Sequence, residues 1–236
     1  MSTMPGMSSF PQAYLLDALG TLLELEPPVE PLRRELRERF GLQLTAAEAG
    51  TAIKAEIAFY RAHHDDASDR EQLAALRRDS ALALRAALPP AGAELPVEPL
   101  TEALLAAIRF RPYPEVVEVL ERARSRGRRL VVVSNWDVSL HDALEESGLA
   151  PLLDGVLTSA EVGSSKPDGA IFARGLELAG VDAGAALHVG DDYAADVEGA
   201  RAAGIDVRLV VRDGAVAPAG VATVRSLREL PGIAAA

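Results

Sequence analysis

The 236-residue chain contains no cysteine. Disulfides, zinc–thiolate centres and thiol nucleophiles are therefore excluded, so any chemistry has to come from carboxylate, hydroxyl, amine or imidazole groups. Lysine is scarce too, because Lys54 and Lys166 are the only lysines among 24 basic residues. The chain has 35 acidic residues, which give a net charge of −11. This balance predicts no nucleic-acid partner, since binding a phosphate backbone needs a concentrated basic face.

Long apolar runs are also missing from the sequence. No stretch of about 18 uncharged apolar residues could cross a membrane, and residues 1–9 lack the basic and apolar regions of a signal peptide. We therefore expect a cytoplasmic protein with no membrane partner, either a monomer or a homodimer. The length favours one large domain with an insertion, and residues 231–236 look like a frayed tail.

Short apolar runs occur at five places, separated by segments with helical patterns. They lie at residues 14–17, 130–133, 155–158, 186–189 and 207–211. Such alternation predicts βαβ units and a parallel sheet with helices on both faces. Between the first two runs all patterns are helical, with capping boxes predicted at residues 45–48 and 68–71. The predicted fold class is α/β: a Rossmann-like parallel-sheet core, residues 1–25 and 111–236, with an inserted all-α domain, residues 26–110.

Polar side chains stand where four of these runs end. Because parallel strands bring their carboxyl ends to one edge of a sheet, we expect these side chains to converge. A carboxylate can attack an anionic group only when the charge repulsion is offset, which a divalent cation together with a lysine would do. The residues concerned are Asp17, Ser134, Asn135, Lys166, Asp191, Asp192 and Asp196.

Several of these residues have simpler interpretations. Ser134 and Asn135 could cap the helix that follows them, and Asp196 could be a solvated helix residue. His188, inside an apolar strand, is expected to be a core histidine rather than a ligand, and Trp136 is expected to pack beside the site. A lysine kept in an arginine-rich chain, by contrast, favours a functional ammonium group at Lys166.

The four motifs, in this order, resemble the haloacid dehalogenase superfamily of aspartyl-nucleophile hydrolases, in the subfamily whose α-helical cap is inserted after the first strand. The resemblance covers residues 10–25 and 111–212 and implies that residues 26–110 form the cap. It implies that Asp17 is transiently esterified, that Ser134, followed by Asn135, donates a hydrogen bond to the transferring group, and that Lys166 offsets charge. The implied Mg²⁺ ligands are Asp17, the backbone carbonyl of Leu19 and Asp191, with Asp192 or Asp196 in support.

The sequence departs from this pattern at Leu19. Phosphatases of the superfamily carry a second aspartate there, which protonates the leaving group and then activates water. Leucine can do neither, and loss of a general acid-base costs about 10²- to 10⁴-fold in rate. The resemblance therefore implies a Mg²⁺-dependent phosphohydrolase acting on a small phosphorylated metabolite, either slow or restricted to good leaving groups.

Two alternatives stay open. A metal-free 2-haloacid dehalogenase would use Asp17 to attack carbon, and an apolar Leu19 would suit it. Dehalogenases of the family, however, replace the metal-binding acids with a Ser-Asn type sequence that this chain lacks. The second alternative is a catalytically silent phosphate-binding or scaffold protein, which only Leu19 supports.

Substrate recognition is expected to come from the cap. Lys54 and Arg61 are seven residues apart on a predicted helix, so they lie within about 20° of one another around its axis. This pair could meet an anionic part of the substrate away from the reacting centre. A solvated helix face is the alternative interpretation.

Overall fold

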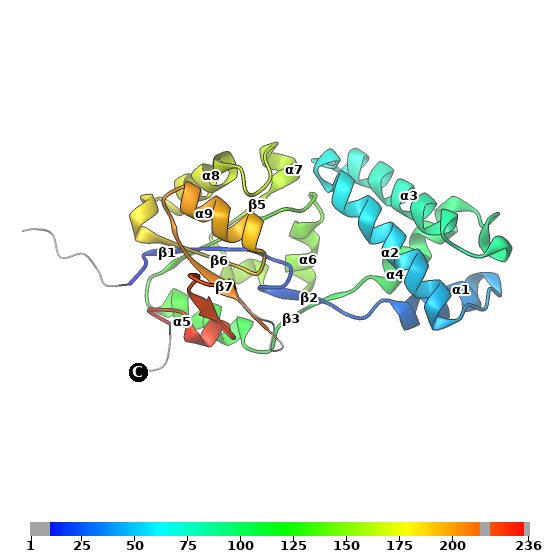
Figure 1. Ribbon diagram of the computed structural model, residues 1–236, viewed down its shortest axis with the longest axis horizontal. Helices are drawn as coiled ribbons and strands as arrows, with labels where there is room; N and C mark the ends of the chain where they lie inside the picture. The colour runs from blue at the N-terminus through cyan, green and yellow to red at the C-terminus, as the bar shows by residue number, and fades with distance from the viewer. Residues whose placement is uncertain (1–9, 213–217, 234–236) are drawn as a thin grey trace, which may run out of the picture.

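The computed structural model describes residues 10–212 and 218–233. A parallel sheet with helices on both faces forms one part, and a helical unit lies beside it, joined to it by two connections (Figure 1). The sheet has six strands, and every neighbouring pair is parallel. In spatial order these are β5 (Gly155–Thr158), β4 (Arg129–Ser134), β1 (Ala13–Leu16), β6 (Ala186–Gly190), β7 (Asp206–Val210) and β8 (Thr223–Val224). The predicted α/β fold class is confirmed.

The strands are apolar throughout because both faces of the sheet are covered. In β1, Tyr14 and Leu16 face α5 (Val116–Ser125) and α6 (Leu140–Glu146). Ala13 and Leu15 point to the opposite face, where α8 (Gly169–Ala179) and α9 (Gly199–Ala202) pack. Because side chains alternate along a strand, β1 contributes residues to two separate apolar layers, one on each face of the sheet. Shorter helical segments are α7 (Ser159–Val162), a π-helix at Tyr193–Glu198, and 3₁₀ turns at His64–Asp66, Pro90–Gly92, Ala150–Leu152, Ala183–Ala185 and Leu227–Glu229.

The inserted unit consists of α1 (Val29–Phe40), α2 (Ala46–His63), α3 (Arg70–Ala86) and α4 (Val97–Ala107), packed around their own leucine-rich core. The capping box at the start of α2 forms as predicted, between Thr45 and Glu48. The second predicted capping box is wrong. Asp69, not Ser68, caps α3, while the Ser68 hydroxyl bonds to Gln72. Within the described residues, no helix has the length and apolar character needed to span a bilayer.

The two connections between the sheet and the helical unit pair with each other. Here β2 (Leu23–Leu25) and β3 (Phe110–Pro112) form an antiparallel ribbon that the sequence patterns did not predict. Three-residue strands are too short to show a period, and their partners lie far apart along the chain. The predicted frayed tail is also wrong for residues 231–233, because Ile233 is buried and the Tyr14 hydroxyl donates to the Pro231 carbonyl. Residues 234–236 lie outside the described part of the chain.

Glu56 on α2 is a carboxyl group buried between helices of the inserted unit. Burial raises the pKa of Glu56 from 4.5 to about 7, and the Ser80 hydroxyl on α3 only partly offsets this shift. Between these two pH values the folded protein keeps a proton that the unfolded chain has lost. Stability therefore falls as the pH rises through this window and stays constant above it, a total loss of about 3 kcal/mol.

We expect Glu56→Gln to be more stable than the unaltered protein, by a margin that grows from about pH 5 to about pH 8, because a neutral amide avoids the buried charge. Urea unfolding at the two pH values measures this margin. Glu71→Gln, at an exposed position on α3, is the control and should show no such growth. An equal margin at both pH values would contradict the assignment of a raised pKa to Glu56.

Candidate active site

Asp17 lies at the carboxyl end of the central strand β1. Its backbone N–H donates to the Val189 carbonyl at 2.9 Å, which extends the parallel pairing with β6 by one residue. The carboxylate is buried, and its Oδ1 accepts from the Ser134 hydroxyl at 2.9 Å and from Lys166 Nζ at 2.6 Å. Burial raises the pKa of Asp17, and the Lys166 ammonium opposes that shift. Residues from the ends of three sequence segments thus meet at one carboxylate.

Lys166 is buried between two carboxylates. Its Nζ lies 2.6 Å from both Asp17 Oδ1 and Asp196 Oδ1. Burial alone would lower the pKa of Lys166, but these two charges outweigh it and hold that pKa above its ordinary value. Asp196 Oδ1 also contacts His188 Nε2 at 2.8 Å, and its Oδ2 accepts from the Asp192 N–H. Asp196 is therefore a fixed counter-ion for the lysine, not a solvated helix residue.

Asn135 holds the backbone of Lys166 in place. Its side-chain amide donates to the Lys166 carbonyl at 2.9 Å, and its Oδ1 accepts the Lys166 N–H at 2.7 Å. Neither Ser134 nor Asn135 caps α6, whose N-cap residue is Ser139; the Ser139 N–H donates to Asp137 Oδ1. The capping interpretation of Ser134 and Asn135 is thus excluded.

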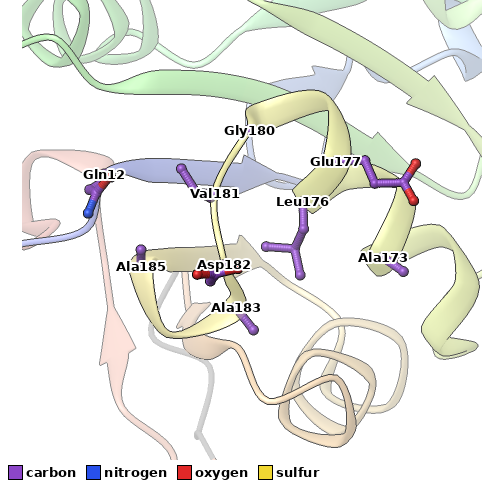
Figure 2. A pocket seen from close by; sticks show the side chains of 9 residues that line it. All are labelled: Gln12, Ala173, Leu176, Glu177, Gly180, Val181, Asp182, Ala183 and Ala185. Carbon is purple, nitrogen blue, oxygen red and sulfur yellow. The ribbon is translucent and has the colours of Figure 1, made fainter.

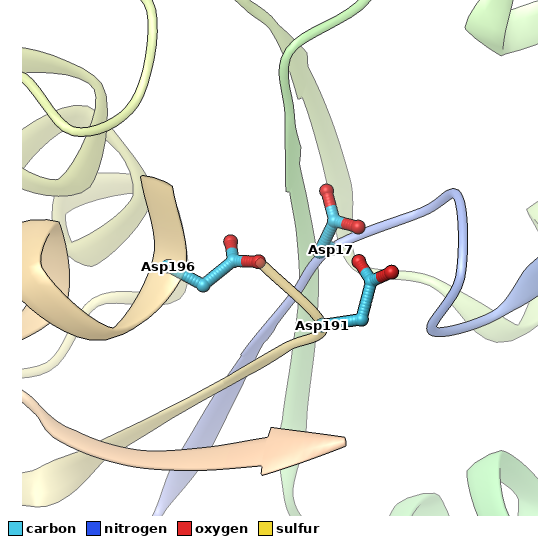
Figure 3. A group of neighbouring side chains, drawn as sticks. All are labelled: Asp17, Asp191 and Asp196. Atoms are coloured by element: carbon cyan, nitrogen blue, oxygen red, sulfur yellow. The ribbon is translucent and has the colours of Figure 1, made fainter. Parts of the chain in front are cut away.

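Three carboxyl groups gather at this edge of the sheet. Figure 3 shows Asp17, Asp191 and Asp196 on three separate segments, and one oxygen from each lies within 4.8 Å of the others. The Lys166 ammonium contacts two of these carboxylates, Asp17 and Asp196, and no contact between it and Asp191 is seen among the described residues. Loss of hydration and the charges of Asp17 and Asp196 raise the pKa of Asp191 to about 7. Oxygen donors in this number suit a hard divalent cation such as Mg²⁺.

Gly20 makes room for this arrangement. It adopts a φ of +81°, which favours glycine, and a Cβ atom there would lie only 2.1 Å from Asp191 Oδ2. The turn after Asp17 therefore packs its backbone directly against the Asp191 carboxylate. A side chain at position 20 would displace that carboxylate from the group.

Not every residue of the predicted site joins this group. Asp192 is exposed, and its carboxylate accepts from the Ala195 N–H at the start of the π-helix. The Leu19 side chain is 38% exposed. Lys54 and Arg61 are exposed on α2. As expected, Trp136 is buried beside the site, against Phe110.

The inserted helical unit meets the sheet unit through polar contacts that the sequence patterns did not indicate. The Tyr60 hydroxyl of α2 donates to Asp137 Oδ2 at 2.9 Å. Asp65, in the turn after α2, accepts from the hydroxyls of Ser159 and Ser165. Since Ser165 directly precedes Lys166, this contact connects the inserted helical unit to the segment that carries the ammonium group. An Asp in a helix-ending turn carries no sequence signal that distinguishes it from an ordinary solvated acid.

A hollow of about 590 Å³ lies elsewhere on the core (Figure 2). It is lined by Gln12, Leu176 and Ala185, among others, at the amino ends of β1 and β6. Ligands of open parallel sheets bind outside the carboxyl ends of the strands. Because the hollow lies at the amino ends of the strands, it is at the opposite edge of the sheet from the carboxylate group and is separate from it.

Residues 11–204 match the sequence profile of the family described as haloacid dehalogenase-like hydrolase. The chain belongs to this family. The resemblance predicted from the four motifs is thereby confirmed, and a hydrolase is the enzyme class that the family implies.

Relatives of this chain include proteins named as phosphatases. Haloacid dehalogenase-like hydrolase domain-containing protein 3 of Bos taurus is 41% identical over 127 residues, which are 51% of this chain and 51% of the relative. Phosphoserine phosphatase of Thermus thermophilus is 41% identical over 98 residues, 41% of this chain and 39% of the relative. The chain thus matches about half, or less, of the length of these relatives.

The fold has close counterparts among solved structures. A HAD phosphatase from Thermococcus onnurineus is 26% identical, with a TM-score of 0.61 over 92% of this chain and 95% of that chain. A dehalogenase structure, 23% identical, gives a TM-score of 0.66 over 94% and 96% of the two chains. At that identity the second likeness concerns the fold alone.

Proposed function

We propose that this protein is a Mg²⁺-dependent phosphohydrolase that acts on a small phosphorylated metabolite through an aspartyl-phosphate at Asp17. The observation that carries the proposal is the group of three carboxyl side chains, Asp17, Asp191 and Asp196, each with one oxygen within 4.8 Å of the others. A metal-free dehalogenase would have no use for a third carboxyl group at this place, because it holds no cation there. The phosphatase names of relatives support the same choice.

The roles follow from the contacts. Asp17 attacks phosphorus, and the bond to the leaving oxygen breaks as an aspartyl-phosphate forms, which water then hydrolyses. Lys166 and the Ser134 hydroxyl, both already at Asp17 Oδ1, lie where they can stabilise charge on the transferring group. Asn135 and Asp196 hold the lysine in that position.

Mg²⁺, when bound, supplies the positive charge that lets two anions approach. Its proposed ligands are Asp17, the Leu19 carbonyl and Asp191, with Asp192 and Asp196 in support through the hydrogen bonds that they make. Residues 26–110 are proposed to act as the cap over the core formed by residues 1–25 and 111–236. The Leu19 side chain offers no acid-base group to the leaving oxygen, so we expect good leaving groups to be preferred.

The experiment that tests the proposal compares p-nitrophenyl phosphate with chloroacetate, each with Mg²⁺ and with EDTA. We expect release of p-nitrophenol only with Mg²⁺, and no halide release in either condition. Halide release from chloroacetate in EDTA would establish a dehalogenase instead. Inactivity on both compounds, and on a panel of phosphorylated metabolites, would favour a catalytically silent phosphate-binding protein.

We further propose that Lys54 and Arg61 bind the anionic remainder of the substrate. Both side chains are exposed on α2, and Arg61 directly follows Tyr60, which contacts the core. We expect Lys54→Ala and Arg61→Ala to raise KM on a physiological substrate by about tenfold, the loss of one charge-assisted contact. Arg78→Ala, at an exposed site on α3, is the control. Unchanged kcat/KM in both variants would show that Lys54 and Arg61 belong to an ordinary solvated helix face and do not bind substrate.

A further inference from the structure

Arg212 lies two residues after the end of β7, at the same edge of the sheet as the carboxylate group. Its guanidinium group donates to two successive carbonyls of the turn that follows Asp17. Nε contacts the Gly20 carbonyl at 3.3 Å, and Nη2 contacts the Thr21 carbonyl at 3.0 Å. One side chain thus binds the backbone on which the Asp191 carboxylate packs.

The same guanidinium group is held from its other sides by the returning connection from the cap. Nη1 forms an ion pair with Glu115 Oε1 at 2.8 Å, and Glu115 is buried. The guanidinium carbon lies 3.5 Å from the centre of the Tyr113 ring, stacked over its face. Both chain connections between core and cap therefore meet at Arg212.

The turn itself is closed by its own amides. The Gly20 N–H donates to the Leu23 carbonyl, and the Leu22 and Leu23 N–H groups donate to the Ala18 carbonyl, each at 2.8 Å. The Gly20 and Thr21 carbonyls accept their hydrogen bonds from Arg212. A lysine could not replace it, because an ammonium group lacks the planar fork that reaches two carbonyls and a carboxylate together.

We infer that Arg212 is a positioning residue that fixes the turn at residues 18–23 for cation binding. By fixing the turn, it holds in place the Leu19 carbonyl and the Gly20 backbone against which the Asp191 carboxylate packs. The inference rests on the proposed metal-dependent function. It adds to the proposed site a residue that acts through the turn. The same residue also binds Glu115 and Tyr113, which lie just after the β2–β3 ribbon that leads to the cap. Partners that orient metal ligands without touching the metal typically change affinity about 10- to 100-fold when they are removed.

The test measures Mn²⁺ binding by electron paramagnetic resonance, and amide hydrogen exchange of the metal-free protein. We expect Arg212→Gln to weaken Mn²⁺ binding about 10- to 100-fold and to speed exchange at residues 20–23 by at least about tenfold. Arg212→Lys keeps the charge and should lose nearly as much. Arg208→Gln, on the same strand, removes an equal charge away from the turn, because Arg208 donates to the Val207 carbonyl. It should match the unaltered protein.

Unchanged Mn²⁺ affinity and unchanged exchange in folded Arg212→Gln would overturn the inference, as would normal values of both properties in Arg212→Lys. If Arg212→Gln does not fold, Arg212→Lys carries the test. The exchange measurement needs neither metal nor substrate. Failure of the proposed phosphohydrolase, seen as inactivity of the unaltered protein, is therefore distinguishable from failure at Arg212.

Discussion

Asp17→Asn lowers hydrolysis of p-nitrophenyl phosphate by at least about 10⁴-fold, because an amide cannot form the acyl-phosphate. The substitution is nearly isosteric, and the Asn oxygen can still accept from the Ser134 hydroxyl, so the fold should survive. The loss should appear in kcat as well as in kcat/KM, since the missing step is chemical. Steady-state kinetics with saturating Mg²⁺, accompanied by thermal unfolding, measure both.

Asp182→Asn is the matched control for this prediction. Asp182 is exposed at the opposite edge of the sheet, and its side chain caps no helix. Its variant should retain full activity. If Asp17→Asn keeps more than a small fraction of the activity, the nucleophile lies elsewhere and the phosphoryl-transfer account is wrong.

Leu19→Asp should accelerate hydrolysis of the aspartyl-phosphate by about 10²- to 10⁴-fold, the usual contribution of a general acid-base. The position can accept the change, because the Leu19 side chain is 38% exposed and its pairing with Leu23 uses backbone atoms. In the unaltered protein, slow dephosphorylation should give a burst of p-nitrophenol followed by slow turnover. The burst should vanish in Leu19→Asp.

Leu19→Asn separates polarity from proton transfer, since the amide has the shape of aspartate but cannot act as an acid or base. It should leave turnover slow. If Leu19→Asp folds, binds Mn²⁺ and still turns over no faster, another residue supplies the proton.

The positions of most candidate site residues were predictable because they stand at or shortly after the end of an apolar run. Asp17, Ser134 and Asp191 needed no knowledge of the tertiary structure beyond the rule that parallel strands end at one edge. Lys166 is an exception, because α7 and three further residues separate it from the end of β5. The scarcity of lysine in this arginine-rich chain was the additional signal for it.

The hydrogen bonds were not predictable in the same way. That Asn135 clamps the Lys166 backbone, or that Asp192 caps a turn, depends on side-chain directions that no spacing encodes. Ser68 and Asp69 are both good helix caps, so the sequence alone does not choose between them; in the structure the Asp69 side chain accepts from the Glu71 and Gln72 N–H groups. Arg212 follows a strand, as the site residues do, and that placement was the signal available for it.

The central claim is tested most directly by trapping the covalent intermediate. The unaltered protein is mixed with p-nitrophenyl phosphate and Mg²⁺, quenched in acid during the burst, and reduced with borohydride, which converts an aspartyl-phosphate to homoserine. Peptide mass spectrometry should then find homoserine at position 17 and at no other aspartate, with none formed in EDTA. Substrate turnover without any modification of Asp17, or with the label at another residue, would contradict the account.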